Sequence, residues 1–221
     1  MMARLLRSDP VRPSPDSSRP QSSDVAVLRE LCPDMALGDR QAAAAALLGY
    51  LRILGRWNAR LNLVSEADRG AVWERHVVPS LQLRVSIRGV RHESVVDLGS
   101  GAGFPGIPLA ITSPSSRFTL VESRRRRASF LRAVARELSL DNAEVVHGRI
   151  EEWRPRSRAD IVLARAVADP ERIAALVTHV LAPDGFLLVT LPPASDPEGQ
   201  QCGARPPHCC RHTFWQPFSH T

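Results

Sequence analysis

The segment best suited to chemistry is the glycine-rich stretch VVDLGSGAGFPGIPLAI, residues 95–111. An apolar run ends at Asp97, and four glycines follow it at close spacing: Gly99, Gly101, Gly103 and Gly106. Because glycine has no Cβ, such a loop can turn sharply and approach a ligand closely. The last three glycines form GxGxxG, the fingerprint of dinucleotide-binding loops, which is a weak signal by itself. A tight strand-to-helix turn without a ligand is the plainer alternative.

The neighbouring residues favour a cationic cofactor over a dinucleotide. Asp97 would repel a pyrophosphate, and Pro105 and Pro108 restrict the helix start whose N–H groups would bind one. S-adenosylmethionine has a sulfonium and an ammonium group, and a carboxylate attracts both. Glu122 ends the next expected strand and suits the ribose hydroxyls, a role that NAD would share. We therefore expect S-adenosylmethionine and keep an NAD-dependent oxidoreductase as a remote alternative.

The wider sequence around this loop is recognisable. The loop resembles the first motif of class I methyltransferases and, more narrowly, that of the ribosomal RNA small subunit methyltransferase G family, also called glucose-inhibited division protein B. WNARLNLVS and ERHVVPSL precede the loop, and FTLVES, FLRAVARELSL, GRIEEW and ARAVA follow it, in the order and spacing of that family. The resemblance covers residues 37–191.

The resemblance implies an enzyme that uses S-adenosylmethionine to methylate N7 of a guanine in 16S ribosomal RNA. Carried over position by position, it implies a cofactor site made of Gly99, Gly101, Phe104, Glu122, Ile150, Glu151 and Arg165. Glu122 would bind the ribose, and Ile150 and Glu151 would border the adenine. Two plainer alternatives stay open: Glu151 as a helix-start carboxylate, and Arg165 as part of a surface ion pair.

This reaction requires little acid–base chemistry from the protein. Guanine N7 has a lone pair and no proton to lose, and the sulfonium already activates the methyl group, so positioning supplies most of the catalysis. We therefore expect no metal and no protein nucleophile, and we assign no catalytic residue. The target base must be unpaired or splayed out, because the major groove of A-form RNA hides N7. His76 and Asn58 are either RNA contacts or hydrogen-bonded helix residues.

The charge balance fits a nucleic-acid partner. The formal net charge is +6, and every basic residue is arginine, which pairs with phosphate and stacks on bases. Arginines 124–127 either bind phosphate or form a solvated helix face. The sequence contains no run suited to a membrane span and begins without a secretory signal. We expect a cytoplasmic monomer that acts on 16S rRNA or the small ribosomal subunit and has no membrane contact.

The elements that would position these residues predict an α/β fold. Five β-branched runs (SVVDL, FTLVE, AEVVH, DIVLA and FLLVT) alternate with helix-length segments, which predicts a Rossmann-like, mostly parallel twisted sheet with helices on both faces. The predicted divisions are a disordered leader (1–34), a methyltransferase domain (35–191) and an irregular tail (192–221). Within the domain, a helical part (35–92) precedes the Rossmann-like core (93–191).

Three departures from the family concern the fold and the site. Pro79 replaces an aspartate and should kink or end its helix. Leu191 and Pro192 replace a Lys-Gly pair, which removes a cation from the rim of the site. The closing two-stranded hairpin has no counterpart in the tail, so we expect FLLVT to form an exposed sheet edge. These departures keep open a degenerate RNA- or cofactor-binding relative with weak turnover.

Overall fold

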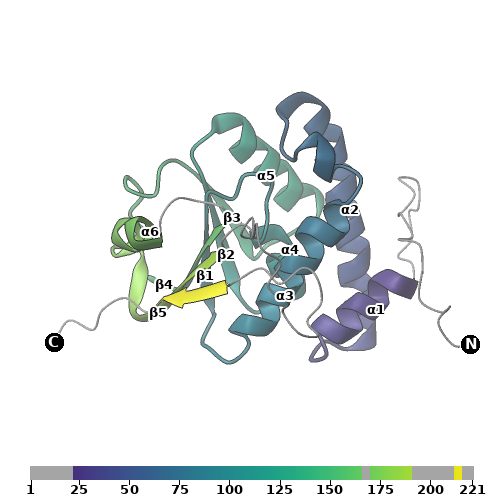
Figure 1. The fold of residues 1–221 in the computed structure, drawn as a ribbon, viewed down its shortest axis with the longest axis horizontal. Coiled ribbons are helices and arrows are strands. Elements are labelled where there is room, and N and C mark those ends of the chain that lie inside the picture. The colour runs from purple at the N-terminus through teal and green to yellow at the C-terminus, as the bar shows by residue number, and fades with distance from the viewer. Residues whose placement is uncertain (1–21, 166–169, 191–211, 216–221) are drawn as a thin grey trace, which may run out of the picture.

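The computed structural model describes residues 22–165, 170–190 and 212–215 of the 221-residue chain. It forms one six-stranded sheet in the order β3-β2-β1-β4-β5-β6, in which β1 to β5 are parallel and β6 is antiparallel to β5 (Figure 1). The strands are β1 (Ser94–Leu98), β2 (Arg117–Glu122), β3 (Ala143–His147), β4 (Ala159–Arg165), β5 (Leu181–Thr190) and β6 (His212–Trp215). The predicted Rossmann-like α/β fold is confirmed.

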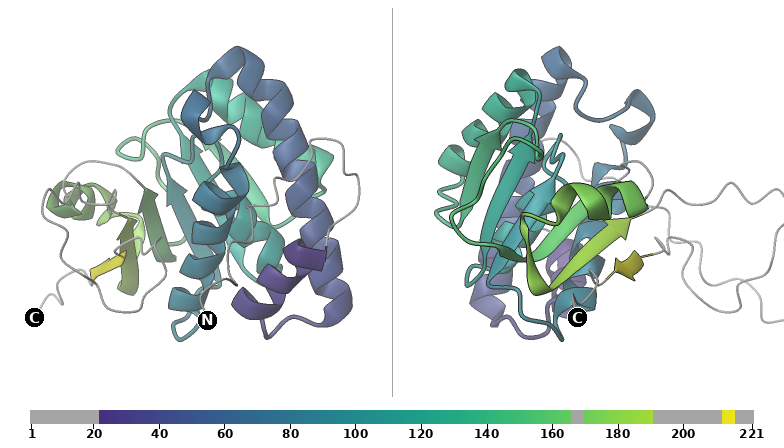
Figure 2. Two further views of the ribbon diagram at one scale, coloured as in Figure 1. Left: turned by 45° about the vertical axis from the view of Figure 1, so that its right-hand side comes forward. Right: turned by 90° about the vertical axis from the view of Figure 1, so that its left-hand side faces the viewer.

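Helices cover both faces of this sheet. They are α1 (Ser22–Leu31), α2 (Leu37–Leu61), the short η1 (Glu66–Asp68), the π-helical η2 (Trp73–Val77), α3 (Val78–Ile87), α4 (Gly106–Thr112), α5 (Arg125–Glu137) and α6 (Pro170–Val177). Figures 1 and 2 show α6 on one side and α2 to α5 on the other. Successive strand residues serve the two sides: Val95 packs towards α3 and α4, and Val96 towards α6. Burial on both faces explains the continuous apolar strands.

The strand order places the start of the glycine loop at the switch point of the sheet. β1 pairs with β2 on one side and with β4 on the other. Connections from β1 and β4 therefore run outwards in opposite directions, and a crevice opens above the carboxyl ends of the central strands. The predicted site residues follow β1, β2, β3 and β4, so the topology gathers them at this edge.

Helix α1 corrects the predicted disordered leader for residues 22–34. Leu28 and Cys32 are fully buried in the core that α2 also lines. Asp34 accepts hydrogen bonds from both terminal nitrogens of Arg84 in α3, at 2.8 and 2.6 Å. A ten-residue helix gains most of its stability from such tertiary packing, which local composition does not reveal. Residues 1–21 of the predicted leader lie outside the described residues.

Pro79 disrupts the regular helix as predicted, through a π-helical turn rather than a chain break. The backbone N–H of Val78 donates to the carbonyl of Trp73, five residues back. Pro79 then falls in the first turn of α3, where the ring is tolerated because few N–H groups there need a partner. The turn leaves η2 and α3 continuous, with His76 inside the π-helical segment.

Strand β6 corrects the predicted irregular tail at residues 212–215. It pairs antiparallel with Leu187–Thr190, so this part of β5 is bonded on both sides and is not the exposed edge that we expected. An apolar strand with free N–H and C=O groups can recruit any extended segment, whatever its side-chain period. Residues 191–211 and 216–221, which include Leu191 and Pro192, lie outside the described residues.

Within the described part of the chain, no helix is long and apolar enough to cross a membrane.

Replacing Leu28 tests whether α1 belongs to the folded unit. Leu28→Ala removes a fully buried side chain and should lower the free energy of unfolding by about 2–5 kcal/mol. Denaturant titration measures this change. The matched control is Glu30→Ala on the exposed side of the same helix, which should change the free energy by less than about 0.5 kcal/mol. Equal stability of the two variants would show that α1 does not contribute to the core.

Candidate active site

The glycine loop joins β1 to α4 and has a left-handed backbone at three positions. Gly99, Gly101 and Gly103 have φ angles of 71°, 54° and 93°, which residues with a Cβ rarely adopt. The N–H groups of Gly99 and Ser100 both donate to the carbonyl of Val121 in β2, at 2.8 and 3.2 Å. The loop therefore folds back over the end of the neighbouring strand.

Two buried carboxylates hold this loop from below. Glu122 accepts from the N–H of Gly101 at 2.9 Å with one oxygen and from the N–H of Arg124 at 2.7 Å with the other. Asp97 accepts from the N–H of Gly106 at 3.2 Å through Oδ2. Both side chains are almost fully buried, and Oδ1 of Asp97 has no hydrogen-bond partner. We call Asp97, Glu122 and the loop N–H groups that they accept the buried frame. Among the described residues, Oδ1 of Asp97 has no hydrogen-bond donor and is therefore an unused acceptor of this frame.

Burial controls the ionisation of Asp97. Removal from water raises the pKa of this carboxyl from 3.8 to about 6, although the nearby Ser100 hydroxyl, the N–H of Gly106 and the charge of Arg165 act in the opposite direction. The Ser100 hydroxyl itself donates to the backbone carbonyl of Asp97 at 2.9 Å, which leaves Oδ1 without a hydrogen bond. A buried carboxylate is costly unless it is paired with a positive group or fully hydrogen-bonded. The site is therefore matched to a ligand with positive charge or N–H donors near Oδ1.

Helix α2 holds the glycine loop from the other side. Tyr50 is completely buried, and its hydroxyl donates to the carbonyl of Ala102. Its ring meets Phe104 edge-on, with 5.3 Å between the centroids. A side chain at Gly103 would lie within 3.1 Å of the Tyr50 hydroxyl and 2.8 Å of Ile107. The close approach of α2 thus requires glycine at this position.

A cleft of about 350 Å³ opens beside the loop at the carboxyl ends of β1, β2 and β3. Three predicted site residues line it: Gly99, Ile150 and Glu151. The sequence reasoning missed the other lining residues, which are Leu98, Val121, Ser123, Gly148, Arg149, Arg172, Ile173 and Leu176. Ser123 and Gly148 directly follow strands, a position that marks ligand sites in such sheets. The three residues of α6 have no comparable signal, because only the packing of α6 brings them here.

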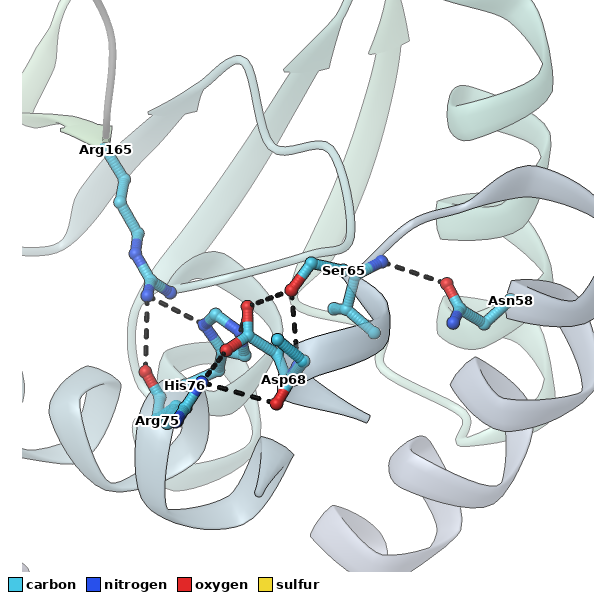
Figure 3. Close-up of polar contacts among 8 residues, drawn as sticks. Asn58, Ser65, Asp68, Arg75, His76 and Arg165 are labelled. Carbon is cyan, nitrogen blue, oxygen red and sulfur yellow. Dashed lines mark hydrogen bonds and ion pairs between the residues drawn. The ribbon is translucent and has the colours of Figure 1, made fainter. Parts of the chain in front are cut away.

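The remaining predicted residues take other positions. Glu122 and Gly101 form the buried frame under the loop, and Phe104 and Arg165 meet His76 outside the residues that line the cleft. The His76 ring stacks on Phe104 with 5.0 Å between centroids. Nη2 of Arg165 lies 2.8 Å from Nδ1 of His76 and 3.3 Å from the carbonyl of Arg75 (Figure 3).

Asn58 is a hydrogen-bonded helix residue, one of the two alternatives left open by the sequence. It is 4% exposed, and its Oδ1 accepts from the N–H of Val64 at 2.9 Å (Figure 3). This bond closes the turn after α2, where Asn62 adopts a left-handed conformation. Asn58 therefore fixes the start of the segment that leads to His76.

Replacing Asp97 tests the ionisation of the buried carboxyl. Between pH 3.8 and about 6 the folded protein keeps a proton that the unfolded chain has lost, so the free energy of unfolding should fall as pH rises. The rise of the Asp97 pKa from 3.8 to about 6 corresponds to a loss of about 3 kcal/mol in the free energy of unfolding, at about 1.4 kcal/mol per pKa unit. Asp97→Asn cannot ionise, so its stability relative to wild type should rise by up to this amount between pH 4 and 7.

Denaturant titration at several pH values provides this measurement. The control Asp184→Asn changes an exposed aspartate in the same way and should keep the wild-type pH slope. A constant difference between wild type and Asp97→Asn across this range would contradict a raised pKa for Asp97.

Comparisons with known proteins identify the family of this chain. Residues 43–196 match the family model GidB: rRNA small subunit methyltransferase G. The chain is 43% identical over 143 residues to the Ribosomal RNA small subunit methyltransferase G of Cereibacter sphaeroides, which covers 63% of this chain and 68% of the relative. It is 35% identical over 167 residues to the protein of the same name from Chlorobium limicola, with 76% of each chain covered.

Solved structures include methyltransferases with a similar arrangement. One from Geobacter sulfurreducens has a TM-score of 0.48 and 17% identity, over 64% of this chain and 69% of that chain. Coclaurine N-methyltransferase bound to N-methylheliamine and SAH has a TM-score of 0.47 and 19% identity, over 64% and 42%.

The family match confirms the methyltransferase prediction and S-adenosylmethionine as the cofactor, against the NAD-dependent alternative. The matched segment runs from α2 through the glycine loop and the five parallel strands. The chain therefore belongs to the ribosomal RNA small subunit methyltransferase G family.

Proposed function

We propose that this chain transfers a methyl group from S-adenosylmethionine to N7 of a guanine in the 16S rRNA of the small ribosomal subunit. It would act as a monomer in the cytoplasm. The observation that supports this most directly is the unpaired, buried Oδ1 of Asp97 beneath a left-handed glycine loop that borders a cleft. The family membership supplies the substrate class.

The residues of the site fit the proposed cofactor. When bound, S-adenosylmethionine supplies a methyl group that its sulfonium activates. Gly99 has open space where a Cβ would project, so its backbone leaves room beside the cleft. Glu122 uses each oxygen once, and a carboxylate oxygen has a second lone pair that can accept from a ribose hydroxyl. Ile150 and Glu151 would border the adenine in the cleft.

Gly101 would serve the cofactor indirectly. Phe104 lies outside the cleft lining, and only the family resemblance assigns it to the cofactor. The N–H of Gly101 donates to Glu122 and so orients the carboxylate. Phe104 is held between Tyr50 and His76, so its ring is fixed where the loop turns into α4. Asp97 would attract the positive groups of the cofactor, which also relieves the cost of its own burial.

The chain would act on the RNA by positioning rather than by proton transfer. Guanine N7 needs no base, so the protein must hold the nucleotide in line with the methyl group and exclude other orientations. Arg165 was predicted in the cofactor site, but it contacts His76 and does not line the cleft, so we reassign it to the RNA side. It ends β4 at the same sheet edge as the glycine loop and would supply positive charge towards the RNA. An arginine there suits either a phosphate or the face of a base.

The degenerate alternative loses part of its support. It depended on a missing lysine and a missing hairpin. The replacement of Lys-Gly by Leu191 and Pro192 still supports it, but β6 pairs with β5 where an open edge was expected. The buried frame of the glycine loop is complete apart from the oxygen assigned to the cofactor. The pairing of β6 and this frame favour an active enzyme.

The test is methyl transfer from labelled S-adenosylmethionine to small ribosomal subunits and to naked 16S rRNA, followed by identification of the methylated base. We expect one methylated guanine, modified at N7. Gly99→Val should bind the cofactor at least tenfold more weakly and lose transfer, because the branched side chain projects into the open space and the φ of 71° is unfavourable for it. The control Gly55→Ala, in an open helical position, should behave as wild type. Cofactor binding without any RNA methylation would favour the degenerate relative.

Salt dependence tests the arginines that follow β2. Arg125 and Arg126 are exposed in the first turn of α5, beside the cleft residue Ser123. If they contact phosphates, changing both to glutamine should weaken RNA binding and reduce the slope of log affinity against log salt by about 0.7–0.9 per contact. Cofactor affinity should stay unchanged. The control is Arg136→Gln at the other end of α5, and an equal effect there would contradict the assignment.

A further inference from the structure

Three polar residues from separate elements meet beside Phe104. Asp68 belongs to η1, His76 to the π-helical η2, and Arg165 ends β4 (Figure 3). His76 lies between the other two: its Nδ1 is 2.8 Å from Nη2 of Arg165, and its Nε2 is 3.5 Å from Oδ2 of Asp68. The ring is stacked on Phe104 with an angle of 24° between the planes. The imidazole therefore has little freedom to rotate.

This geometry determines the tautomer of His76. A guanidinium nitrogen can only donate a hydrogen bond, so the short contact requires an unprotonated Nδ1 that accepts from Arg165. The single proton of a neutral ring is then on Nε2, which faces Asp68. Nε2 is buried and faces Oδ2 of Asp68 at 3.5 Å, the outer limit of a hydrogen bond, so the carboxylate acts on it mainly through its charge. Neutral His76 thus acts as an acceptor for Arg165 and directs its own N–H towards a carboxylate.

A second proton would destroy the arrangement. With a hydrogen on Nδ1, two donors and two positive charges would oppose each other across 2.8 Å. Among the described residues, the charged groups that face His76 are Arg165 from β4, Asp68 from η1 and Arg75 from its own helix. The pKa of His76 is lowered, first by burial and then by Arg165, while Asp68 acts to raise it. The neutral form is therefore the one present at neutral pH.

Asp68 is itself firmly held, so its effect on His76 is well defined. Its Oδ1 accepts from Arg75 at 2.6 Å, and its Oδ2 accepts from the hydroxyl of Ser65 at 2.7 Å. The Ser65 hydroxyl in turn accepts from the N–H of Asp68 at 3.2 Å and caps η1. The turn closed by Asn58 leads directly into this cap. The N-terminal helical part therefore positions the carboxylate that faces His76.

We propose that neutral His76 is a positioning residue for Arg165: its Nδ1 accepts a hydrogen bond from the guanidinium at the carboxyl end of β4, and protonation of the ring breaks this contact. Asp68 faces the other ring nitrogen, and its charge raises the pH at which this contact is lost, against the effects of burial and Arg165. This inference rests on the proposed function, in which Arg165 faces the RNA. It assigns to His76, in the segment ERHVVPSL, the role of positioning the arginine that would contact RNA, in place of a direct RNA contact.

The first test uses the cofactor-free protein and needs no activity. Nitrogen NMR of labelled protein reports the tautomer and the titration of His76, and the N–H signals of Arg165 report whether its guanidinium is held. We expect a protonated Nε2 and a bare Nδ1 at pH 7.5, and loss of the restrained Arg165 signals as His76 titrates below pH 6.5. Asp68→Asn removes a charge that favours protonation, so the titration should move to lower pH.

The second test compares pH profiles of methyl transfer at saturating cofactor. In wild type the transfer rate should fall on the acid side with the same midpoint as the His76 titration. His76→Asn keeps an oxygen acceptor close to the position of Nδ1 but cannot be protonated, so this acid limb should disappear. His76→Phe keeps the aromatic stack and removes the acceptor; its transfer rate should fall at least tenfold at every pH, with less than a twofold change in cofactor affinity. Partial rescue by asparagine, but not by phenylalanine, distinguishes positioning from packing.

Several results would overturn this inference. They are a protonated Nδ1 at neutral pH, an unchanged or higher titration midpoint in Asp68→Asn, or equal pH profiles of the asparagine variant and wild type. Failure of the proposed function has a different signature. If NMR shows the expected tautomer and the release of Arg165 but no RNA is methylated, the positioning role is supported and the proposed reaction is rejected.

Discussion

The site depends on two buried carboxylates at the ends of adjacent parallel strands. Asp97 in β1 and Glu122 in β2 accept the N–H groups of Gly106 and Gly101, and so hold both ends of the glycine loop. Carboxylates at this depth are costly without such donors, and the loop supplies them only in its left-handed conformation. The loop and the carboxylates therefore require each other. Oδ1 of Asp97 remains without a partner among the described residues, and in the proposed function a positive group of the cofactor would complete the frame.

The buried frame lies between two neighbouring regions, the cleft and the contact of His76 with Arg165. On one side lies the cleft between the strand ends and α6, which would hold the adenosine part of the cofactor in the proposed function. On the other, Phe104 carries the stack of His76, and His76 contacts Arg165. The glycine loop lies between the two regions, so in the proposed function its conformation would affect cofactor and RNA contacts together. The two regions also interact electrostatically: burial raises the pKa of Asp97, and the positive charge of Arg165 opposes this rise.

The helical N-terminal part is a component of this site. Tyr50 of α2 holds the glycine loop, Asn58 closes the turn that follows α2, and Asp68 and His76 reach the end of β4. The π-helical turn before Pro79 allows this placement, because it keeps the chain helical while the proline enters α3. Pro79, which would kink a regular helix, is accommodated here by a single π-helical turn. The same turn presents the imidazole to Arg165.

The sequence by itself determined the elements whose signals are local. Five β-branched runs became the parallel strands, and the glycines after Asp97 became the left-handed loop, because buried strands and positive φ angles restrict residue types at each position. Only the tertiary structure decided the role of α1, the pairing of β6, the lining of the cleft by α6 and the contact of His76 with Arg165. That contact joins residues 89 positions apart, and the burial of Leu28 in α1 depends on packing against other helices. Such interactions gain their free energy from surfaces that meet only after folding, so no local pattern of residue types encodes them.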